Sequence, residues 1–379
     1  MRSLFSPCQL GPFALKNPLA ALPFFTAYAD DKGFVTDQLL EHYSRIAGSG
    51  VGLVVVEAAA LRSPIVRPYC IGAFGPEHLQ GLRRLAQVVQ AQGATAVLQI
   101  CHPGRFSFVP GALAPSPVPP FGMVDLMPRE MSEEDMAVVA EAFAESAQVA
   151  REAGFDGVEL HGATGYLLSS FISLRTNTRT DAYGGSLENR MRFPLRVCAE
   201  VRKRVGDYPV GYRLMVREYS PGGLALEEGV VFARALQKEL EPAYLSVTAG
   251  TYECWAMLAE QKQKETEGYM LPEAKAVKAA VPDVSVIAAG VLQTPEICQN
   301  ALDDKSADGI GFGRVLFADV DWVRKATGQT ADPIRACVHC GNCQRQVSQD
   351  KPAFCSLWTK EEKARYLKNV PSERLVKKQ

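Results

Sequence analysis

The sequence has few of the features that would place a protein on a membrane or on nucleic acid. Its 379 residues include 41 Lys and Arg against 42 Asp and Glu, so no positive excess predicts binding to nucleic acid or to an anionic surface. No apolar run reaches the roughly 18 residues of a membrane span. The segment before Gly11 lacks the sustained apolar core of a signal peptide. We therefore expect a cytoplasmic protein.

A dinucleotide-binding fingerprint and a disulfide framework are also missing. The glycine-rich stretches GVGLVVV and GIGFG lack the G-x-G-x-x-G spacing that opens a helix in such a fingerprint. Apart from a group near the C-terminus, the cysteines are scattered singly, which is typical of reduced thiols. We therefore expect no NAD(P)H-binding domain and no set of structural disulfides in this chain.

What the sequence does contain is a regular alternation of short apolar segments and longer amphipathic ones. The apolar segments predict eight strands, at residues 17–24, 51–58, 95–101, 155–162, 208–215, 242–249, 283–290 and 307–313. The amphipathic segments predict helices at residues 131–154, 186–206 and 294–304, the first with a Ser-x-x-Asp cap. Apolar strands that alternate with helices indicate a parallel sheet covered by helices. Eight such units predict an α/β fold, a (β/α)8 TIM barrel over residues 1–330; an open doubly wound sheet is the alternative.

Polar and glycine residues gather at the C-terminal ends of the predicted strands, where barrels place their chemistry. Gln99 ends the third strand and Arg213 the fifth. Gly290 ends the seventh strand, and Gly313 and Arg314 follow the eighth. Glycines at the last two strands let backbone N–H groups approach a phosphate. Together these residues predict a planar cofactor with a phosphate, lying across the barrel mouth.

Two motifs then resemble a known family. The stretch HGATGYL, followed by TNTRTDAYGGSLENR, resembles the old yellow enzyme family of FMN-dependent oxidoreductases. FISLRTNTRTDAYGG is most similar to the bacterial 2,4-dienoyl-CoA reductase branch, and the resemblance extends over about residues 1–360. It implies FMN on a TIM barrel. It also implies reduction of an activated C=C bond, with a hydride from flavin N5 and a proton from a side chain.

The resemblance also implies roles for individual residues. His161 would bind the substrate carbonyl oxygen and Tyr166 would donate the proton, although Tyr166 can also be an aromatic residue packed at the start of a helix. Tyr252 would replace the catalytic His that dienoyl-CoA reductases carry after the sixth strand. The residues expected to line FMN are Pro23, Phe24, Phe25, Ala58, Gln99, Arg213, Gly290, Gly313 and Arg314.

The sequence departs from the family pattern at two positions of this expected site. Thr164 stands where many members have Asn or His, which weakens the second donor to the carbonyl oxygen. Phe25 stands where a Cys, Thr or His tunes the flavin, and a phenyl ring forms no hydrogen bond with flavin O4. The substrate class therefore does not follow from the resemblance.

Four cysteines near the C-terminus, Cys337, Cys340, Cys343 and Cys355, have the spacing C-x2-C-x2-C-x11-C. Structural zinc sites usually combine two separate C-x2–4-C pairs, whereas three closely spaced cysteines suit an iron–sulfur cubane. We expect a [4Fe-4S] cluster on an extension formed by residues 331–379, with zinc or free thiols as the alternatives. His339 lies within this loop as a neighbour of the cluster rather than a ligand.

In the resembled family, such a cluster passes electrons between FMN and a redox partner. The chain ends soon after the cysteines, so we expect a separate flavoprotein or ferredoxin donor that docks near residues 337–379, through the basic tail. The leading hypothesis is an ene-reductase acting on a small-molecule α,β-unsaturated carbonyl compound or enoyl thioester. The alternatives are an amine dehydrogenase resembling trimethylamine dehydrogenase, which passes electrons out, and a non-catalytic electron-transfer subunit. Because relatives often self-associate, a homo-oligomer is a further expectation.

Overall fold

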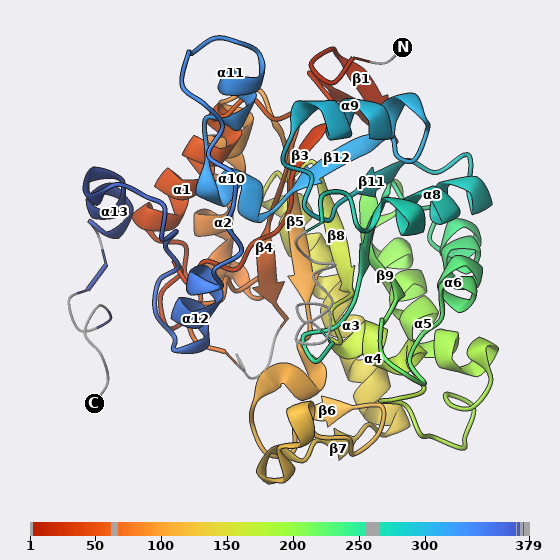
Figure 1. Ribbon diagram of the computed structural model, residues 1–379. Helices are drawn as coiled ribbons and strands as arrows, with labels where there is room; N and C mark the ends of the chain where they lie inside the picture. Colours follow the sequence, from red (N-terminus) through yellow and green to blue (C-terminus); the bar gives the residue numbers. More distant parts are fainter. Residues whose placement is uncertain (1–2, 62–66, 255–265, 369, 372–373, 375–379) are drawn as a thin grey trace.

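The computed structural model describes residues 3–61, 67–254, 266–368, 370–371 and 374 of the chain. Eight parallel strands form a closed barrel (Figure 1) in the order β10-β11-β12-β3-β4-β5-β8-β9. The TIM barrel is thus confirmed, and the open sheet is excluded. The barrel strands are β3 (Leu19–Ala21), β4 (Leu53–Ala60), β5 (Thr95–Cys101), β8 (Gly157–Gly162), β9 (Val210–Arg217), β10 (Leu245–Ala249), β11 (Val286–Ala288) and β12 (Gly309–Phe312).

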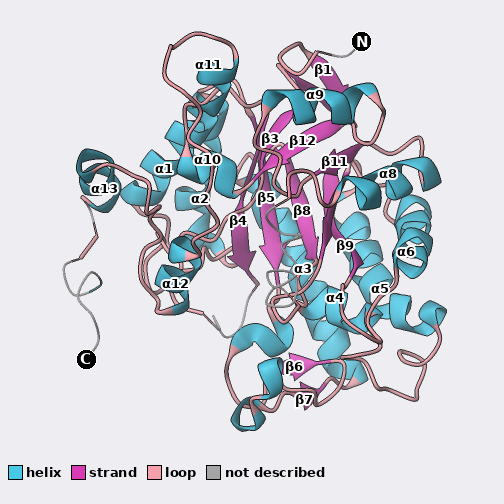
Figure 2. Ribbon diagram, in the orientation of Figure 1, coloured by secondary structure: helices cyan, strands magenta, loops and turns pink. Residues whose placement is uncertain are grey.

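Helices cover the outside of the barrel (Figure 2), as the alternation of segments predicts. Ser132 and Asp135 form a reciprocal cap at the start of α3, and Gly154, with a φ of +84°, follows its end. The helices that cover the barrel are α1 (Asp37–Gly48), α2 (Pro76–Gln90), α3 (Glu133–Glu152), α4 (Leu167–Ile172), α5 (Leu187–Val205), α6 (Leu226–Glu239), α8 (Leu271–Ala280), α9 (Pro295–Asp303), α10 (Arg314–Ala318) and α11 (Trp322–Ala326).

Two barrel strands, β3 and β11, end at least two residues earlier than the sequence predicts, each for a local reason. The chain leaves the sheet after Leu22, whose N–H still donates to Phe312 O at 2.8 Å, because the next residue, Pro23, has no N–H to donate. β11 ends before Gly290, whose φ of +108° is not compatible with an extended strand. Both changes of direction release the following residues from the sheet at the barrel mouth.

A hairpin of β1 (Cys8–Leu10) and β2 (Phe13–Leu15) closes the other end of the barrel, and it was not predicted. Its apolar side chains share one cluster with alternate residues of the barrel strands, such as Leu53 and Val97. The intervening strand residues pack instead in the cluster that contains the helices. The hairpin therefore fills the barrel interior from below, and only the mouth stays open to a ligand. A second short pair, β6 (Leu113–Ala114) with β7 (Arg129–Glu130), lies beside the mouth.

The C-terminal extension, with α12 (Asn342–Ser348) and α13 (Lys360–Leu367), packs on the barrel beside α1 and α10 (Figure 1). Ala353 N donates to Thr26 O at 2.8 Å, and the Tyr28 hydroxyl donates to Ala353 O at 2.6 Å. The Trp358 ring, which is buried, donates from Nε1 to Phe317 O at 2.9 Å. The segment that joins the third and fourth cysteines is therefore fixed to the loop after β3.

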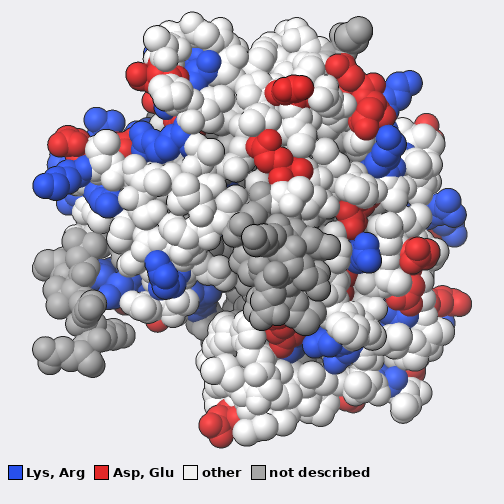
Figure 3. All heavy atoms as spheres, in the orientation of Figure 1, with Lys and Arg blue, Asp and Glu red and all other residues white. Residues whose placement is uncertain are grey.

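The surface of the described residues carries both signs of charge, with Lys and Arg gathered near α12 and α13 (Figure 3). Among all the residues that the structure describes, no helix has the length and apolar composition needed to cross a bilayer.

We predict that Tyr28→Phe loosens the extension. The substitution leaves the buried Ala353 carbonyl without its donor, which typically costs about 1–3 kcal/mol. Amide hydrogen exchange over residues 350–358 is the direct measurement, and we expect it to become faster while exchange in the barrel strands is unchanged. Tyr183→Phe is the matched control, because its hydroxyl contacts the exposed Glu133. Equal exchange in wild type and Tyr28→Phe would contradict the prediction.

Candidate active site

A row of polar side chains crosses neighbouring barrel strands near the mouth. In the parallel register Gln99 on β5 pairs with Glu159 on β8, and Arg213 on β9 pairs with both His161 on β8 and Ser246 on β10. Gln99 Nε2 donates to Glu159 Oε1 at 2.7 Å, and Arg213 Nη1 donates to Ser246 Oγ at 2.6 Å. The barrel therefore brings together the two residues, Gln99 and Arg213, that the sequence assigns to a cofactor ring.

The negative charge of Glu159 and the positive charge of Arg213 stabilise each other within this row. Burial raises the pKa of Glu159, and the Arg213 guanidinium acts against that effect. Burial also lowers the pKa of Arg213, while Glu159 opposes the decrease. Arg213 is partly exposed at the mouth, so its remaining N–H donors are open to a ligand. The arrangement fits a planar ring that becomes negatively charged when reduced, as the flavin of FMN does.

The predicted phosphate end of the site lies beside α10. A Cβ atom added to Gly313 would meet no heavy atom within 4 Å, so the space next to its backbone is open. Gly290 is the other partly exposed glycine predicted there. Arg314 follows Gly313, but its side chain also lines the pocket of the C-terminal cysteines. The open space beside Gly313 thus fits a phosphate group, whereas Met270 fills the Cβ position of Gly290. Arg314 lies between the Gly313 backbone and the cysteines.

Three predicted catalytic residues meet above this row. The hydroxyls of Tyr166 and Tyr252 are 3.1 Å apart, and the ring centroids of His161 and Tyr166 are 4.9 Å apart. Burial, followed by the positive charge of Arg213, lowers the pKa of His161 to about 3. Its Nδ1 accepts from Ala163 N at 3.3 Å, so the proton of the neutral ring is on Nε2. His161 is therefore a neutral hydrogen-bond donor.

Both tyrosines keep their protons over the ordinary pH range. Burial raises the pKa of Tyr166 well above its usual value. Burial also raises the pKa of Tyr252, which the hydrogen bond with Tyr166 partly offsets. The pair can therefore donate a proton and replace it from the neighbouring hydroxyl. The predicted substitution of Tyr252 for a histidine is consistent with this placement, and its catalytic role stays a prediction.

A wall of aromatic residues beside the tyrosines was missed by the sequence analysis. The Phe106 ring is edge-on to Tyr252 at 5.4 Å between centroids. Its neighbour Arg105, only 1 % exposed, forms an ion pair with Glu253, which also accepts from Phe121 N at 2.7 Å. These contacts fix the loop after β5 to the loop that carries Tyr252. Their positions could have indicated this contact, because Arg105 and Glu253 each follow the C-terminal end of a barrel strand.

The two departures from the family pattern have visible consequences. The Phe25 ring lies under the guanidinium of Arg67, 4.6 Å from its centroid, and takes no part in hydrogen bonding through its side chain. Thr164 has a φ of +58°, and its hydroxyl donates to Ala163 O at 2.8 Å. Thr164 is thus bonded within its own turn, and its side chain also hydrogen-bonds Tyr252. Pro23, Phe24 and Ala58, the other residues assigned to FMN, are partly exposed at the same end of the barrel.

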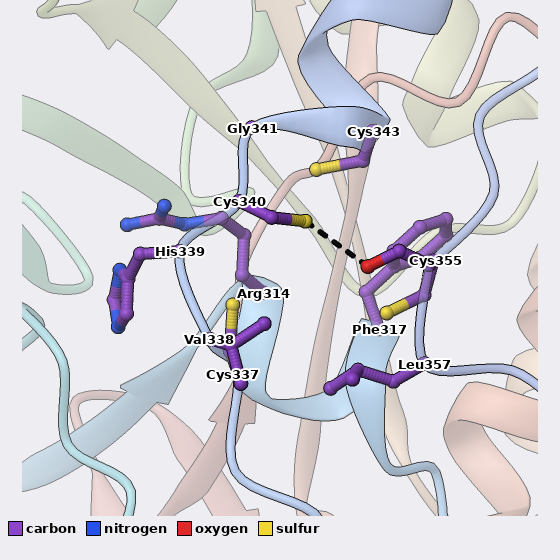
Figure 4. Close-up of a pocket in the computed structure, with 11 residues that line it drawn as sticks. Arg314, Phe317, Cys337, Val338, His339, Cys340, Gly341, Cys343, Cys355 and Leu357 are labelled. Atoms are coloured by element: carbon purple, nitrogen blue, oxygen red, sulfur yellow. Dashed lines mark hydrogen bonds between the residues drawn. The ribbon is translucent and has the colours of Figure 1, made fainter.

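The four C-terminal cysteines line one pocket of about 330 Å³, a volume that includes space open to solvent. Their sulfur atoms point into this pocket (Figure 4), whereas the His339 ring lies to one side. Cys340 is exposed, and its sulfur is 3.0 Å from the Ser356 hydroxyl. Cys337 N donates to Gln293 Oε1 at 2.6 Å, which connects this segment to the barrel.

The distances between the four thiols limit what the pocket can bind. Within the described ranges, no three His, Cys, Asp or Glu side chains are close enough to hold a metal ion. A single zinc ion, with Zn–S bonds of about 2.3 Å, needs sulfur atoms about 4 Å apart. A cubane binds each thiolate through a different iron and so tolerates wider separation. Four thiols around one pocket therefore fit such a larger group better than a single ion.

Comparison with known proteins places the chain in a family. Residues 3–332 match the model of the NADH:flavin oxidoreductase / NADH oxidase family. A metal reductase from Desulforamulus reducens is 38 % identical over 94 % of this chain and 53 % of its own length. A cinnamate reductase from Clostridium sporogenes is 32 % identical over 93 % of this chain and 57 % of its own length. The chain spans about half the length of these two relatives.

A solved structure agrees with these matches. The complex of 2-naphthoyl-CoA reductase with 2-naphthoyl-CoA superposes with a TM-score of 0.86, at 26 % identity, over 94 % of this chain and 57 % of the other. The match supports an eight-stranded barrel with a short C-terminal segment. The chain therefore belongs to the NADH:flavin oxidoreductase / NADH oxidase family of flavin-dependent oxidoreductases, the old yellow enzyme family of its motifs, in which FMN is the expected cofactor.

Proposed function

We propose that the protein is an FMN- and [4Fe-4S]-dependent ene-reductase. Its substrate is an α,β-unsaturated carbonyl compound, and electrons enter through the cluster from a separate flavoprotein or ferredoxin. The observation that carries the proposal is the hydrogen-bonded pair of Tyr166 and Tyr252, 3.1 Å apart, next to a neutral His161. A protonated phenol beside a neutral donor suits protonation of carbon next to a polarised carbonyl group.

Each residue of the mouth has a task in this reaction. His161 donates from Nε2 to the carbonyl oxygen and stabilises the negative charge that develops there. When bound, FMN supplies a hydride to the β carbon. Tyr166 gives its proton to the α carbon, and Tyr252 returns a proton to Tyr166 along their hydrogen bond. Arg213 binds the ring edge where negative charge gathers.

The proposal includes an iron–sulfur cluster because four thiols share one pocket that packs against the flavin end of the barrel. Residues 331–379 form its extension, with Cys337, Cys340, Cys343 and Cys355 as ligands around one pocket. The Phe24 ring, at the flavin end, stacks on Phe317 with centroids 4.4 Å apart, and Phe317 lines the cysteine pocket. This packing supports a short separation between the two redox groups, which one-electron transfer requires.

The exposed edge of the cysteine pocket is the proposed docking place for the electron donor. Cys340 is exposed, and Val338 beside it is 60 % exposed, so a partner could approach the sulfur atoms closely. Lys and Arg side chains around α12 and α13 would attract an acidic partner (Figure 3). Lys377 and Lys378, which the sequence analysis included in the basic tail, lie outside the described residues.

We predict that Tyr166→Phe slows substrate reduction by about 10²–10⁴-fold, the usual contribution of a positioned general acid. The measurement is the anaerobic re-oxidation of dithionite-reduced protein by cinnamaldehyde, followed at the flavin absorption band. Reduction of the flavin by dithionite should be unchanged. Tyr208→Phe is the control, because its hydroxyl bonds Phe155 O at the opposite end of the barrel. A wild-type rate for Tyr166→Phe would remove Tyr166 from the mechanism.

The same re-oxidation rate should not depend on pH between about 5 and 9. His161, with a pKa of about 3, is neutral throughout that range. Burial raises the pKa of Tyr166 well above its usual value, so the phenol keeps its proton up to pH 9. An ordinary histidine would instead produce a change near pH 6.5. A titration in the rate near pH 6.5 that His161→Gln abolishes would show that His161 is not the neutral donor described above.

The cluster is tested by composition. Anaerobically purified wild type should contain about four iron and four acid-labile sulfide per chain, the content of one cubane. Cys343→Ser should lose most of both and retain flavin, since Cys343 lies in the cysteine pocket and not at the barrel mouth. Cys8→Ser, on β1 at the far end of the barrel, is the matched control. Zinc without sulfide in the wild type would refute the cluster and favour the zinc alternative.

A further inference from the structure

Arg67, in the loop after β4, differs from three other arginines near the barrel mouth, each of which pairs with a glutamate. Arg105 pairs with Glu253, Arg175 with Glu218, and Arg217 with Glu273. By contrast, no carboxylate from the described ranges lies within 4.0 Å of the Arg67 side-chain nitrogens. A guanidinium without a carboxylate partner attracts anions, so the contacts of Arg67 indicate which anion could bind at the mouth.

Two contacts hold Arg67 in place. Its guanidinium carbon is 4.6 Å from the centroid of the Phe25 ring, and its Nη2 donates to Val347 O at 2.5 Å. A guanidinium has five N–H donors, so most remain for a ligand. Arg67 is partly exposed, like Phe25 beneath it. The side chain is therefore oriented in advance, and its charge is not consumed by the contacts that orient it.

The guanidinium also acts on the residues proposed to deliver the proton. Burial raises the pKa values of Tyr166 and Tyr252, and the charge of Arg67 lowers both against that effect. Its stacking partner Phe25 follows β3 at the same end of the barrel. The contact and the electrostatic effect both place the Arg67 charge at the mouth where the substrate must bind.

We propose that Arg67 binds the carboxylate of an α,β-unsaturated carboxylic acid, so that the protein reduces free 2-enoates. The inference rests on the proposed ene-reductase function and makes its substrate class specific. Guanidinium and carboxylate match in charge and in hydrogen-bonding geometry, and a fixed guanidinium loses little entropy on binding. A neutral aldehyde or ester offers no such partner.

The chemistry of free acids explains why a cation is needed there. A 2-enoate already carries one negative charge, and hydride addition at its β carbon places a second on the carboxylate group. His161 alone donates one neutral hydrogen bond, whereas Arg67 adds a full positive charge to the same developing anion. Proton transfer from Tyr166 to the α carbon then gives the saturated carboxylate. Two electrons leave the reduced flavin, and the C=C bond takes up one hydride and one proton.

The test compares an acid with a neutral compound of the same carbon skeleton. Arg67→Gln removes the charge and keeps an amide donor for Val347 O. Dithionite-reduced wild type and variant are re-oxidised anaerobically by trans-cinnamate or by cinnamaldehyde. For Arg67→Gln we expect the apparent second-order rate with cinnamate to fall by about 100-fold, as for loss of one partner from a charge pair, mostly through weaker binding. The rate with cinnamaldehyde should stay within about threefold, and Arg67→Lys should partly restore cinnamate reduction.

Binding without turnover gives a second readout. The saturated acid 3-phenylpropanoate should perturb the flavin spectrum of the oxidised wild type, and Arg67→Gln should raise its Kd by a similar factor. Arg83→Gln, an exposed arginine on α2, is the matched control and should change neither measurement. Equal flavin and iron contents in all variants exclude a folding defect.

The outcomes separate the inference from the function on which it rests. If Arg67→Gln leaves cinnamate reduction unchanged, or slows both substrates equally, Arg67 does not bind a carboxylate. If wild type reduces cinnamaldehyde and not cinnamate, the ene-reductase stands and the free-acid substrate class is wrong. If reduced wild type is re-oxidised by neither compound, the proposed function itself fails.

Discussion

Closure of eight parallel strands into a barrel decides where every residue of the candidate site can lie. Parallel strands direct all their C-terminal ends to one side, so residues far apart in sequence meet there. Gln99, His161, Arg213 and Tyr252 come from four different strands or their following loops, yet they surround one mouth. The N-terminal hairpin fills the opposite end with apolar side chains. A ligand can therefore enter from one side only.

The short loop after β3 connects the mouth with the extension. Phe25 contacts Arg67 at the mouth, and Phe24 stacks on Phe317, which lines the cysteine pocket. Between these two sites, Thr26 N donates to the buried Glu57 at 2.8 Å, and Thr26 O accepts from Ala353 N. Displacement of this loop would alter both sites at once. The proposed flavin and cluster would both rest on this one loop, which would keep the distance between them constant and favour rapid electron transfer.

Protonation states complete the account of the mouth. The low pKa of His161 follows from burial and from the neighbouring Arg213, so that the ring is a neutral donor. The high pKa of Tyr166 follows mainly from burial and makes the phenol a reservoir of protons. The same barrel interior thus produces opposite shifts in two adjacent groups, because burial disfavours the charged form of each. Tyr166 therefore starts the reaction with the proton that it would give to carbon, and His161 starts it as a neutral hydrogen-bond donor.

Most of the fold could be predicted from the sequence, because buried parallel strands are continuous apolar runs and each of the eight barrel strands showed one. The β1–β2 hairpin was missed, since strands of three residues leave too little pattern. Polar residues at strand ends indicated Gln99 and Arg213. The pairs Arg105–Glu253 and Arg67–Phe25 could not be predicted, because they depend on how loops distant in sequence fold over the mouth.

The central claim is that this mouth reduces an activated C=C bond. Its most direct test is a single anaerobic turnover, in which fully reduced protein is mixed with excess unsaturated carbonyl compound and the products are counted. We expect the oxidised flavin spectrum to return and one saturated product to form for each two electrons that leave the protein. A flavin that stays reduced, with the alkene recovered intact, would contradict it.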